Sequence, residues 1–425
     1  MSDPDLDEPD PDVPSRPAVD GPALDVLIVG GGLVGASLAC ALEGSGLRVA
    51  LAEATAGAAA GAPSFDERNL ALARASRNAL TTLGVWRHLA GPASPIERIH
   101  VSSRGDFGAV RLRATDYGLD AFGAVVVARE LGAALETRLA ELRDVERLRP
   151  ARVIGIEPGA DAIRVQLQRE GAETTLATRL LVAADGTESS LRTALGIAVE
   201  REDYHQTLFV ATVELGKPHA QEAFERFTEH GPVALLPLAG TRCGSILTVP
   251  AAQADAVVAM DDDAYRALLQ ERFGWRLGRL GRIGRRSAYP LQRVCATRLT
   301  APRAVLVGNA AQTIHPIGAQ GFNLGLRDAL TLAEELEAAV HAGGDAGDPL
   351  RLQRYAARRQ ADRAQTMGFS DGLLRLFAHT AAPVRALRSL GLMALDRVPG
   401  LNDGLVSGAM GFRGDVPRHA RDGAA

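Results

Sequence analysis

The feature that most constrains the fold is the stretch DVLIVGGGLVGASLACALEGSGLRVALAE, which spans residues 25–53. An uninterrupted apolar run, Val26–Val29, is typical of a parallel strand that is buried on both faces. Gly30, Gly32 and Gly35 follow in the spacing G-x-G-x-x-G and open a helical pattern. The first two glycines let the turn close and let the backbone approach a pyrophosphate, and the third lets the helix pack on the strand. The stretch predicts a site for the ADP half of a dinucleotide, with the phosphates at the helix N-terminus.

An acidic residue in the expected place strengthens this prediction. Glu53 closes the second strand, 18 residues after Gly35. A carboxylate there can accept hydrogen bonds from ribose hydroxyls and would repel a 2′-phosphate. A glycine-rich structural turn is the alternative, but the order strand, turn, helix, strand and acid favours the dinucleotide site.

Further along, the pattern departs from the repeated β-α units of an NAD-dependent dehydrogenase. Residues 151–184 read as a three-stranded meander that returns into a last apolar strand. That strand ends at Asp185, within the pattern D-G-x-x-S-x-x-R at a strand-to-helix junction. Two interpretations stay open: Ser189 or Thr187 caps the following helix, or the segment belongs to a ligand site.

A third cluster, VGNAAQTIHPIGAQGFNLGLRD at residues 307–328, combines several glycines with few charges. A strand over residues 304–307 ends at Gly308, and Asn309 can offer its side chain to a ribityl or phosphate oxygen. We expect a helix to begin near Phe322. Its N-terminal amides suit a reduced flavin, which carries negative charge near N1 and the C2 carbonyl, whereas nicotinamide gains no such charge. The cluster therefore favours a flavin.

With these three clusters the chain resembles the aromatic-ring flavoprotein monooxygenases, the family of p-hydroxybenzoate hydroxylase, and most of all the branch that acts in ubiquinone biosynthesis. The resemblance extends from about residue 25 to residue 397. It is carried by DVLIVGGGLVGASLA, FDERNLALA, GPVALLPL and YPLQRVCATRLTAPRAVLVGNAAQTIHPIGAQGFNLGLRDA. GNAAQ replaces the GDAAH of most relatives, and GAQG at residues 318–321 departs from the usual AGQG while still permitting a turn.

The resemblance implies a mixed α/β (α+β) fold. It would consist of a Rossmann-like FAD-binding domain of the p-hydroxybenzoate hydroxylase type, an antiparallel-sheet substrate domain and C-terminal helices. The expected division is an acidic disordered tail over 1–23, FAD-binding segments over 24–200 and 296–345, a substrate domain over 201–295 and a helical region over 346–425. Within the substrate domain we expect a helix over residues 261–273, and Leu235, Leu236 and Pro237 are candidates for a pocket wall.

The same resemblance implies roles for individual residues. The glycines of the first loop and Glu53 would hold adenosine diphosphate, two arginines would reach the flavin side and the pyrophosphate, and Asp185 would lie near the pyrophosphate. Asn309 would contact the ribityl chain, and backbone amides at the start of the last helix would face the flavin ring. The implied cofactor-binding residues are Gly30, Gly32, Gly35, Glu53, Arg68, Arg129, Asp185, Asn309, Gly321, Phe322 and Asn323.

The implied activity is FAD-dependent hydroxylation of the ring of a polyprenylated methoxyphenol, with NADH or NADPH as electron donor. Reduced FAD would react with oxygen to give a C4a-hydroperoxide, whose distal oxygen passes to the electron-rich ring. Three alternatives stay open: a sister ubiquinone-pathway hydroxylase that acts on another ring carbon, a flavin-dependent isoprenoid reductase, and a flavin-bound scaffold. The catalytic side chain is not assigned. His315 is a candidate for proton handling, although a histidine before a proline also serves to fix a loop.

The C-terminal part alternates arginines with apolar residues. A basic amphipathic helix of this kind suits an anionic membrane surface, whereas helices packed on the FAD-binding domain would show the same pattern. We expect a cytoplasmic protein without a signal peptide or membrane span, either free or docked on the inner face of the inner membrane. Other ubiquinone-biosynthesis proteins are expected partners. The arginines are Arg351, Arg354, Arg358, Arg359, Arg363, Arg375, Arg385 and Arg388.

Two partner classes are disfavoured by composition. The net charge of −4 gives no reason to expect a nucleic-acid partner. Cys40, Cys243 and Cys295 lie far apart, without the spacing of a disulfide framework or a metal site.

Overall fold

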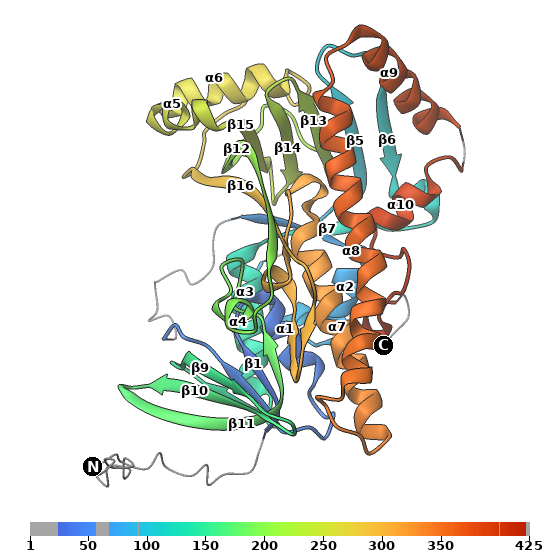
Figure 1. Cartoon of the computed structure of the whole chain (residues 1–425). Helices are drawn as coiled ribbons and strands as arrows, with labels where there is room; N and C mark the ends of the chain where they lie inside the picture. The colour runs from blue at the N-terminus through green and yellow to red at the C-terminus, as the bar shows by residue number, and fades with distance from the viewer. Residues whose placement is uncertain (1–23, 57–67, 92, 399, 422–425) are drawn as a thin grey trace, which may run out of the picture.

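The computed structural model describes residues 24–56, 68–91, 93–398 and 400–421, so the expected tail over residues 1–23 lies outside the described chain. Two large sheets dominate the structure, and a long helix, α8 (Pro349–Ala378), runs alongside both of them (Figure 1). A three-stranded sheet of β3 (Asn69–Ala73), β7 (Gly123–Val127) and β4 (Ser94–Pro95) lies at their junction.

The first large sheet carries the glycine motif, and its strands run in the order β17-β18-β11-β1-β2-β8. Neighbours from β18 to β8 pair in parallel, and β10 and β9 extend from β11 as the expected antiparallel meander. The apolar run of β1 is fully buried, as predicted for a strand covered on both faces. The strands are β1 (Leu24–Val29), β2 (Val49–Ala52), β8 (Val145–Leu148), β9 (Arg152–Pro158), β10 (Ile163–Arg169), β11 (Ala172–Ala183), β17 (Thr300–Ala301) and β18 (Ala304–Leu306).

The second large sheet runs in the order β19-β16-β12-β15-β14-β13-β5-β6. Residues 201–295 supply its centre, but β5 and β6 come from earlier in the chain because β13 pairs in parallel with β5. The sheet is thus assembled from three separate parts of the sequence. Its strands are β5 (Arg98–Ser103), β6 (Ala109–Arg113), β12 (Val199–Glu214), β13 (Glu222–Thr228), β14 (Gly231–Pro237), β15 (Arg242–Pro250), β16 (Ser287–Ala296) and β19 (Gln312–Thr313).

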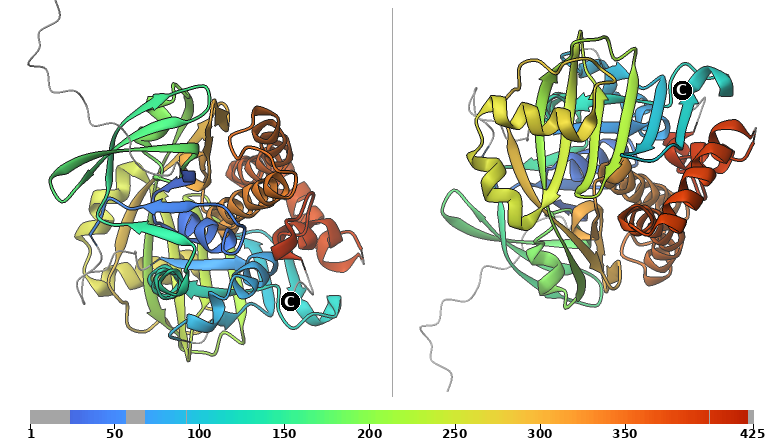
Figure 2. Two further views of the ribbon diagram at one scale, coloured as in Figure 1. Left: turned by 90° about the horizontal axis from the view of Figure 1, so that it is seen from below. Right: turned by 90° about the horizontal axis from the view of Figure 1, so that it is seen from above.

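Helices cover both sheets. α5 and α6 lie over the outer face of the second sheet, whereas α1, α3 and α7 lie by the first (Figures 1 and 2). α6 begins where predicted, because the Asp261 carboxylate accepts a hydrogen bond from the Ala264 amide, and α8 begins at Pro349 behind the cap Asp348. Besides α8, the helices are α1 (Leu33–Ala41), α2 (Arg74–Thr82), α3 (Ala128–Glu141), α4 (Ser190–Ala194), α5 (Ala254–Ala259), α6 (Asp262–Phe273), α7 (Gln320–His341), α9 (Ala382–Arg397) and α10 (Asp403–Ala409).

The second sheet has two apolar faces: the outer face packs beneath α6, and the inner face is turned toward the rest of the protein. Successive side chains of a strand point to opposite faces. Leu235 therefore packs in the core beneath α6, whereas Leu236 packs with Val125 of β7 on the inner face. Of the two leucines proposed as pocket walls, Leu236 has the required direction and Leu235 does not.

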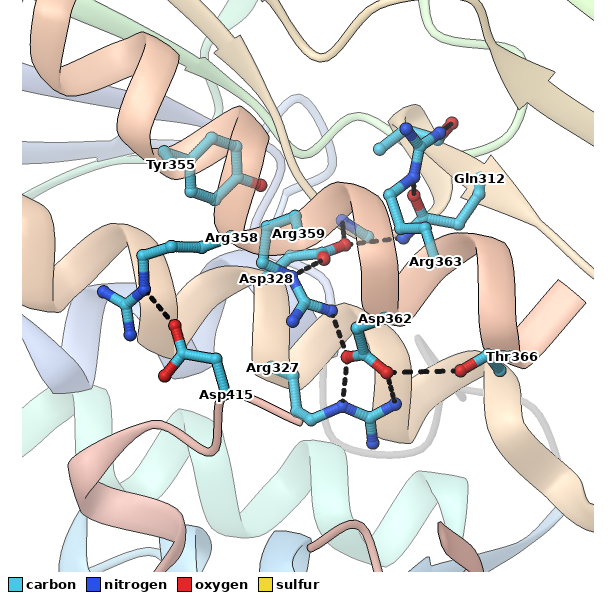
Figure 3. Close-up of polar contacts among 12 residues, drawn as sticks. Gln312, Arg327, Asp328, Tyr355, Arg358, Arg359, Asp362, Arg363, Thr366 and Asp415 are labelled. Carbon is cyan, nitrogen blue, oxygen red and sulfur yellow. Dashed lines mark hydrogen bonds and ion pairs between the residues drawn. The ribbon is translucent and has the colours of Figure 1, made fainter. Parts of the chain in front are cut away.

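A buried charge network joins α7 to α8 (Figure 3). The Asp328 side chain is fully buried and accepts a hydrogen bond from Arg359 Nε at 2.7 Å. Arg359 also lies 2.7 Å from Asp362, which in turn pairs with Arg327. Burial by itself would raise the pKa of Asp362, but Arg327 and Arg359 outweigh it and hold that pKa below its ordinary value. Asp362 is therefore ionised at neutral pH.

This network corrects the interpretation of the C-terminal arginines as one free basic face. Arg359, Arg363 and Arg388 are buried, and Arg358 pairs with Glu334, Glu335 and Asp415. Six of the eight arginines, all except Arg354 and Arg375, have a hydrogen bond or ion pair to another part of the described chain. α8 is thus a helix that packs on the protein. The sequence pattern could not distinguish this arrangement from an amphipathic membrane helix.

Replacing Arg359 with methionine should lower the free energy of unfolding by about 3–5 kcal/mol, because the variant leaves Asp328 as an uncompensated buried charge. Urea unfolding at neutral pH measures the change. The matched control is Arg354→Met on the exposed side of the same helix, which should change stability by less than about 0.5 kcal/mol. Equal losses in the two variants would contradict the proposed contribution of the buried pair.

Candidate active site

Three glycine-containing turns meet at one edge of the first sheet. They follow β1, β11 and β18, which are parallel neighbours, so their carboxyl ends lie together. A Cβ atom on Gly30 would lie 2.4 Å from the Ala184 carbonyl oxygen, and one on Gly308 would lie 3.0 Å from the Val34 side chain. The three motifs recognised separately in the sequence therefore form one continuous edge.

The first turn has the geometry expected of a phosphate-binding loop. Gly30 has a φ of +109°, which favours glycine, and a Cβ on Gly35 would lie 2.0 Å from the Gly30 carbonyl oxygen. Gly32 is different: it has an ordinary φ of −66°, and open space surrounds the position of its missing Cβ. Gly30 and Gly35 are thus required by the fold itself. Gly32 is required only if something occupies the space in front of the loop.

Glu53 lies against this loop, as its place at the end of β2 predicted. Its carboxylate accepts hydrogen bonds from the Gly31 amide at 2.7 Å and from the Thr55 amide at 2.8 Å. These bonds hold the carboxylate at the end of the glycine loop. Each carboxylate oxygen has a second lone pair that can accept a hydroxyl hydrogen bond from a ribose.

The second turn is held by its own side chains. Ser189 caps α4 by accepting a hydrogen bond from the Arg192 amide, and its hydroxyl donates to Asp185 Oδ1 at 2.5 Å. The Leu191 amide donates to Asp185 Oδ2 at 3.1 Å. The capping interpretation of this motif is therefore correct, and Asp185 takes part in the cap. Binding of a cofactor by Asp185 stays a prediction.

Arg192 and Thr187 connect the second turn to the third. The buried Arg192 donates hydrogen bonds to the Ala310 carbonyl and the Thr187 carbonyl, each at 2.9 Å. The Thr187 hydroxyl lies 2.8 Å from the Thr313 hydroxyl. The arginine of the D-G-x-x-S-x-x-R pattern thus positions the loop that follows β18.

The third loop, which follows β18, is held by hydrogen bonds to buried side chains, whereas Asn309 at its tip is exposed. The Gly308 amide and the Gln312 side-chain amide both donate to Asp328 Oδ2, at 3.2 and 2.5 Å. Arg363 Nε of α8 donates to Gln312 Oε1 of the same side chain at 2.7 Å. Gln312 is therefore the side chain that links the loop to the buried charge network (Figure 3), a role that sequence reasoning did not assign.

The remaining predicted residues lie around the start of α7 and the small sheet. Arg68 and Arg129 are both exposed, and they are near neighbours because the Ala128 amide donates to the Arg68 carbonyl. The Arg68 guanidinium lies 5.2 Å from the centre of the Tyr289 ring on β16. α7 begins at Gln320, two residues before the expected Phe322, so the Gly321 amide belongs to its first turn.

Asn323 has a structural use as well as its predicted one. Its side chain accepts a hydrogen bond from the Ala73 amide and donates one to the Ala71 carbonyl, both at 3.0 Å. It thereby fixes the N-terminus of α7 against the edge of β3. Its backbone amide, in the first turn of α7, is the group predicted to face the ring.

His315 is buried just before η5 (Ile317–Ala319). Its Nδ1 accepts a hydrogen bond from the Ile317 amide at 3.3 Å, and Nε2 has no partner within the described chain. Its ring meets Tyr204 edge-on, with 5.0 Å between the ring centres. Burial lowers the pKa of His315 to about 4, although Asp371 acts in the opposite direction. At neutral pH the imidazole is uncharged, carries its proton on Nε2 and orders the loop through Nδ1.

The inner face of the second sheet lies opposite this loop. Leu208, Val210 and Leu291 pack with Tyr204 and Tyr289 in one apolar cluster. A second cluster joins Leu236 and Ala223 to Val125 of the small sheet, and Ile246 belongs to both. A ring held between the two sheets would therefore meet an apolar wall on one side and the glycine-containing loop on the other.

The residues at the sheet edge fit a flavin dinucleotide. Open space where Cβ atoms of Gly32, Gly186 and Gly321 would lie forms a cradle along the edge, and the helices α1 and α7 both start there. Amides at two helix N-termini can hold a pyrophosphate and a negatively charged ring system. The role of each of these residues in binding the cofactor stays a prediction.

Comparison with known proteins supports the same cofactor and fold. A family model described as FAD binding domain matches residues 23–370. Ubiquinone hydroxylase UbiL of Rhodospirillum rubrum is 37% identical over 387 residues, covering 91% of this chain and 89% of that protein. The 3-demethoxyubiquinol 3-hydroxylase of Escherichia coli is 31% identical, covering 91% and 98%. The crystal structure of p-nitrophenol 4-monooxygenase PnpA from Pseudomonas putida DLL-E4 aligns with a TM-score of 0.75 at 18% identity, covering 92% and 98%. The predicted fold class is confirmed.

Two glycine substitutions should separate folding from cofactor binding. Gly35→Ala should lower the free energy of unfolding of the cofactor-free protein by about 1–3 kcal/mol, because the new methyl group collides with the Gly30 carbonyl. Gly32→Ala should leave that stability within about 0.5 kcal/mol of wild type but weaken FAD binding at least about tenfold. Thermal unfolding and a fluorescence titration with FAD measure the two quantities. Unchanged FAD affinity in Gly32→Ala would contradict the assignment of this loop.

Proposed function

The chain belongs to the FAD binding domain family of flavoprotein monooxygenases, and on this premise we propose that it hydroxylates the ring of a polyprenylated methoxyphenol in ubiquinone biosynthesis. The specific activity proposed is that of a 2-polyprenyl-6-methoxyphenol hydroxylase. The observation that carries the proposal is the 37% identity to a ubiquinone hydroxylase across 91% of the chain.

The arrangement of the two sheets supports a large apolar substrate. The inner face of the second sheet presents Leu208, Val210, Leu236 and Ile246 toward the FAD-binding part. An electron-rich phenol with a prenyl tail has mostly apolar surface, which such a wall can shield from water. Exclusion of water matters because it prevents the loss of reactive intermediates to side reactions.

When bound, FAD would supply electron transfer from NADH or NADPH and the activation of molecular oxygen. The residues of this chain would bind, orient and shield. The glycine loop and Glu53 would hold the adenosine end, Asn309 the ribityl chain, and the first amides of α7 the ring. Arg192, Gln312 and Asp328 would keep the loop after β18 rigid through the bonds described above. A neutral His315 would order the turn before α7 through its Nδ1, with Tyr204 packed edge-on against its ring.

A sister hydroxylase that acts at another ring carbon is the second candidate function. The observation in its favour is the 31% identity to a 3-demethoxyubiquinol 3-hydroxylase over 91% of this chain. Both candidates use the same cofactor and the same class of prenylated ring, so they differ only in which carbon faces the flavin.

We also propose that the protein docks on an anionic membrane surface to collect its substrate. None of the helices in the described residues is long and apolar enough to cross a membrane. However, α9 and the segment after it expose Leu387, Leu390, Val398 and Leu401, each at 50% or more. Four exposed apolar side chains within this short part of the chain favour contact with a protein or a membrane. This patch replaces the arginines of α8 as the proposed membrane contact.

Deletion of the gene tests the proposed reaction. Mass spectrometry of quinone lipids should reveal accumulation of the prenylated methoxyphenol, which the wild-type gene clears and a Gly32→Asp variant does not, since a carboxylate in the phosphate loop repels the pyrophosphate. Accumulation of a later, already hydroxylated intermediate would support the sister hydroxylase instead. An unchanged quinone profile would contradict both.

The membrane proposal predicts that Leu387→Glu/Leu390→Glu reduces co-sedimentation with vesicles that contain anionic lipid, because two charges replace the apolar contact. The control is Val258→Glu, which charges a similarly exposed apolar residue on α5, at 60% exposure, away from the patch. If neither variant changes binding, or if wild type does not sediment with the vesicles, the proposed membrane contact is wrong.

A further inference from the structure

One carboxylate on the inner face of the second sheet is not used by any feature described so far. Along β13, Ala223 and Phe227 point to the inner face, and Phe224 points into the core beneath α6. Side chains alternate along a strand, so Glu225 points to the inner face between Ala223 and Phe227.

The neighbours of Glu225 across the sheet are apolar. It is paired with Val101 on β5 and with Ala234 on β14. Ala234 is paired with Ile246 on β15, which is paired with Val210 on β12. These residues form one row on the inner face, and Glu225 is the single charged member of this row of five. A glutamate in such a row cannot be explained by sheet packing, which favours apolar side chains on a buried face.

The positions on either side of Glu225 show what it faces. Ala223 packs with Val125 and Ala71 of the small sheet, whose β3 is bonded to Asn323 of α7. Phe227 stacks on Phe377 of α8, with 3.7 Å between the ring centres, and belongs to the same apolar cluster as Ile317 of η5, in the loop that precedes α7. Glu225 therefore points toward the seam between the second sheet and the start of α7, where the flavin ring is predicted to lie.

The Glu225 carboxylate has no hydrogen bond or ion pair to any residue within the described ranges. Burial alone raises the pKa of Glu225 to about 8. Its surface exposure is nevertheless intermediate, so the residue is not sealed from solvent. A buried carboxyl group without a partner is costly, and such groups are concentrated at functional sites.

Other titratable groups on the elements around this face leave the pKa of Glu225 unchanged, because burial is its only cause. These groups are Arg68 before β3, Tyr204 on β12, Tyr289 on β16, His315 before η5 and Asp371 on α8.

We propose that Glu225 is a catalytic residue that binds the hydroxyl group of the phenol substrate and accepts its proton. The inference rests on the proposed function, since it concerns the same ring. In the step, the phenol O–H bond breaks, an O–H bond forms on a Glu225 carboxylate oxygen, and the electron pair stays on the phenol oxygen. The resulting phenolate is a better nucleophile at the ring carbons ortho and para to it, which are the positions that hydroxylation attacks.

The environment of Glu225 suits this transfer. A phenol has a pKa of about 10, and a carboxylate with an ordinary pKa is a poor base toward it. Raising the pKa of the carboxyl group brings it closer to that of the phenol, which favours proton transfer. An apolar wall would also discourage water from competing for the carboxylate. The transfer also requires that the phenol oxygen comes within hydrogen-bonding distance of the Glu225 carboxylate when the ring lies on the inner face.

The kinetic test uses FAD-loaded protein, NADH or NADPH, oxygen and 2-geranyl-6-methoxyphenol as a short-tailed probe. Glu225→Gln should lower kcat/KM on the order of a hundredfold or more. It should also remove the rise of kcat/KM with pH that wild type shows as Glu225 ionises near its pKa of about 8. FAD affinity should be unchanged. The matched control, Glu229→Gln, removes an exposed carboxylate beyond the end of β13 and should keep both the rate and the pH profile.

An infrared titration of the same holoprotein gives a second readout that does not depend on turnover. The carbonyl stretch of a protonated carboxylic acid should titrate near pH 8 in wild type and in Glu229→Gln, and be missing from Glu225→Gln. Addition of 2-geranyl-6-methoxyphenol should shift this band in wild type, because the phenol hydroxyl bonds to the carboxyl group.

The two readouts separate failure of this inference from failure of the proposed function. Normal hydroxylation by Glu225→Gln with the wild-type pH profile would overturn the role of Glu225 and leave the hydroxylase assignment intact. If wild type forms no hydroxylated product but the phenol shifts the Glu225 band, the proposed reaction fails while the phenol contact stands. If the phenol leaves the band unchanged, the proposed contact is overturned whatever the turnover.

Discussion

The carboxylate of Asp328 is the interaction on which the candidate site most depends. It is fully buried on α7 and binds three partners from different parts of the chain: the Gly308 amide, the Gln312 side chain and Arg359 of α8. Removal of any one partner would leave charge or polar groups unsatisfied in the interior, where that is costly. The same group thus fixes the loop that carries Asn309 and the helix behind it. A loop built from small residues and glycines can be rigid because the buried Asp328 carboxylate holds it by hydrogen bonds.

The candidate site also depends on the two large sheets, which are built from different parts of the sequence and meet at one edge. Parallel strands bring three turns together, and the antiparallel sheet adds an apolar inner face opposite them. Two charged residues of the second turn are engaged within the protein: Asp185 in a helix cap and Arg192 with two carbonyls. Glu225 differs because its burial is not compensated. This contrast between satisfied and unsatisfied polar groups separates the structural part of the site from the part that is available for chemistry.

Local chemistry made much of this predictable from the sequence. Glycine spacing, the buried run of β1 and the acid after β2 require a specific turn, so the loop at Gly30–Gly35 and the place of Glu53 followed directly. The meander and α6 followed from turn residues and a capping aspartate. Long-range pairing did not follow: the recruitment of β5 beside β13 and the burial of Arg359 depend on partners more than 30 residues away. For the same reason Glu225 was missed, because its neighbours Val101 and Ile246 are adjacent only in the folded sheet.

The proposed function requires that this protein transfers an oxygen atom from molecular oxygen to a prenylated phenol ring. The most direct measurement is turnover of 2-geranyl-6-methoxyphenol by the purified, FAD-loaded protein under isotopically labelled oxygen gas, with mass spectrometry of the product. We expect one labelled oxygen atom on the ring of each product molecule, and we expect turnover to require both FAD and oxygen. Product that carries oxygen from water, or a saturated prenyl tail formed without oxygen, would contradict the proposed function.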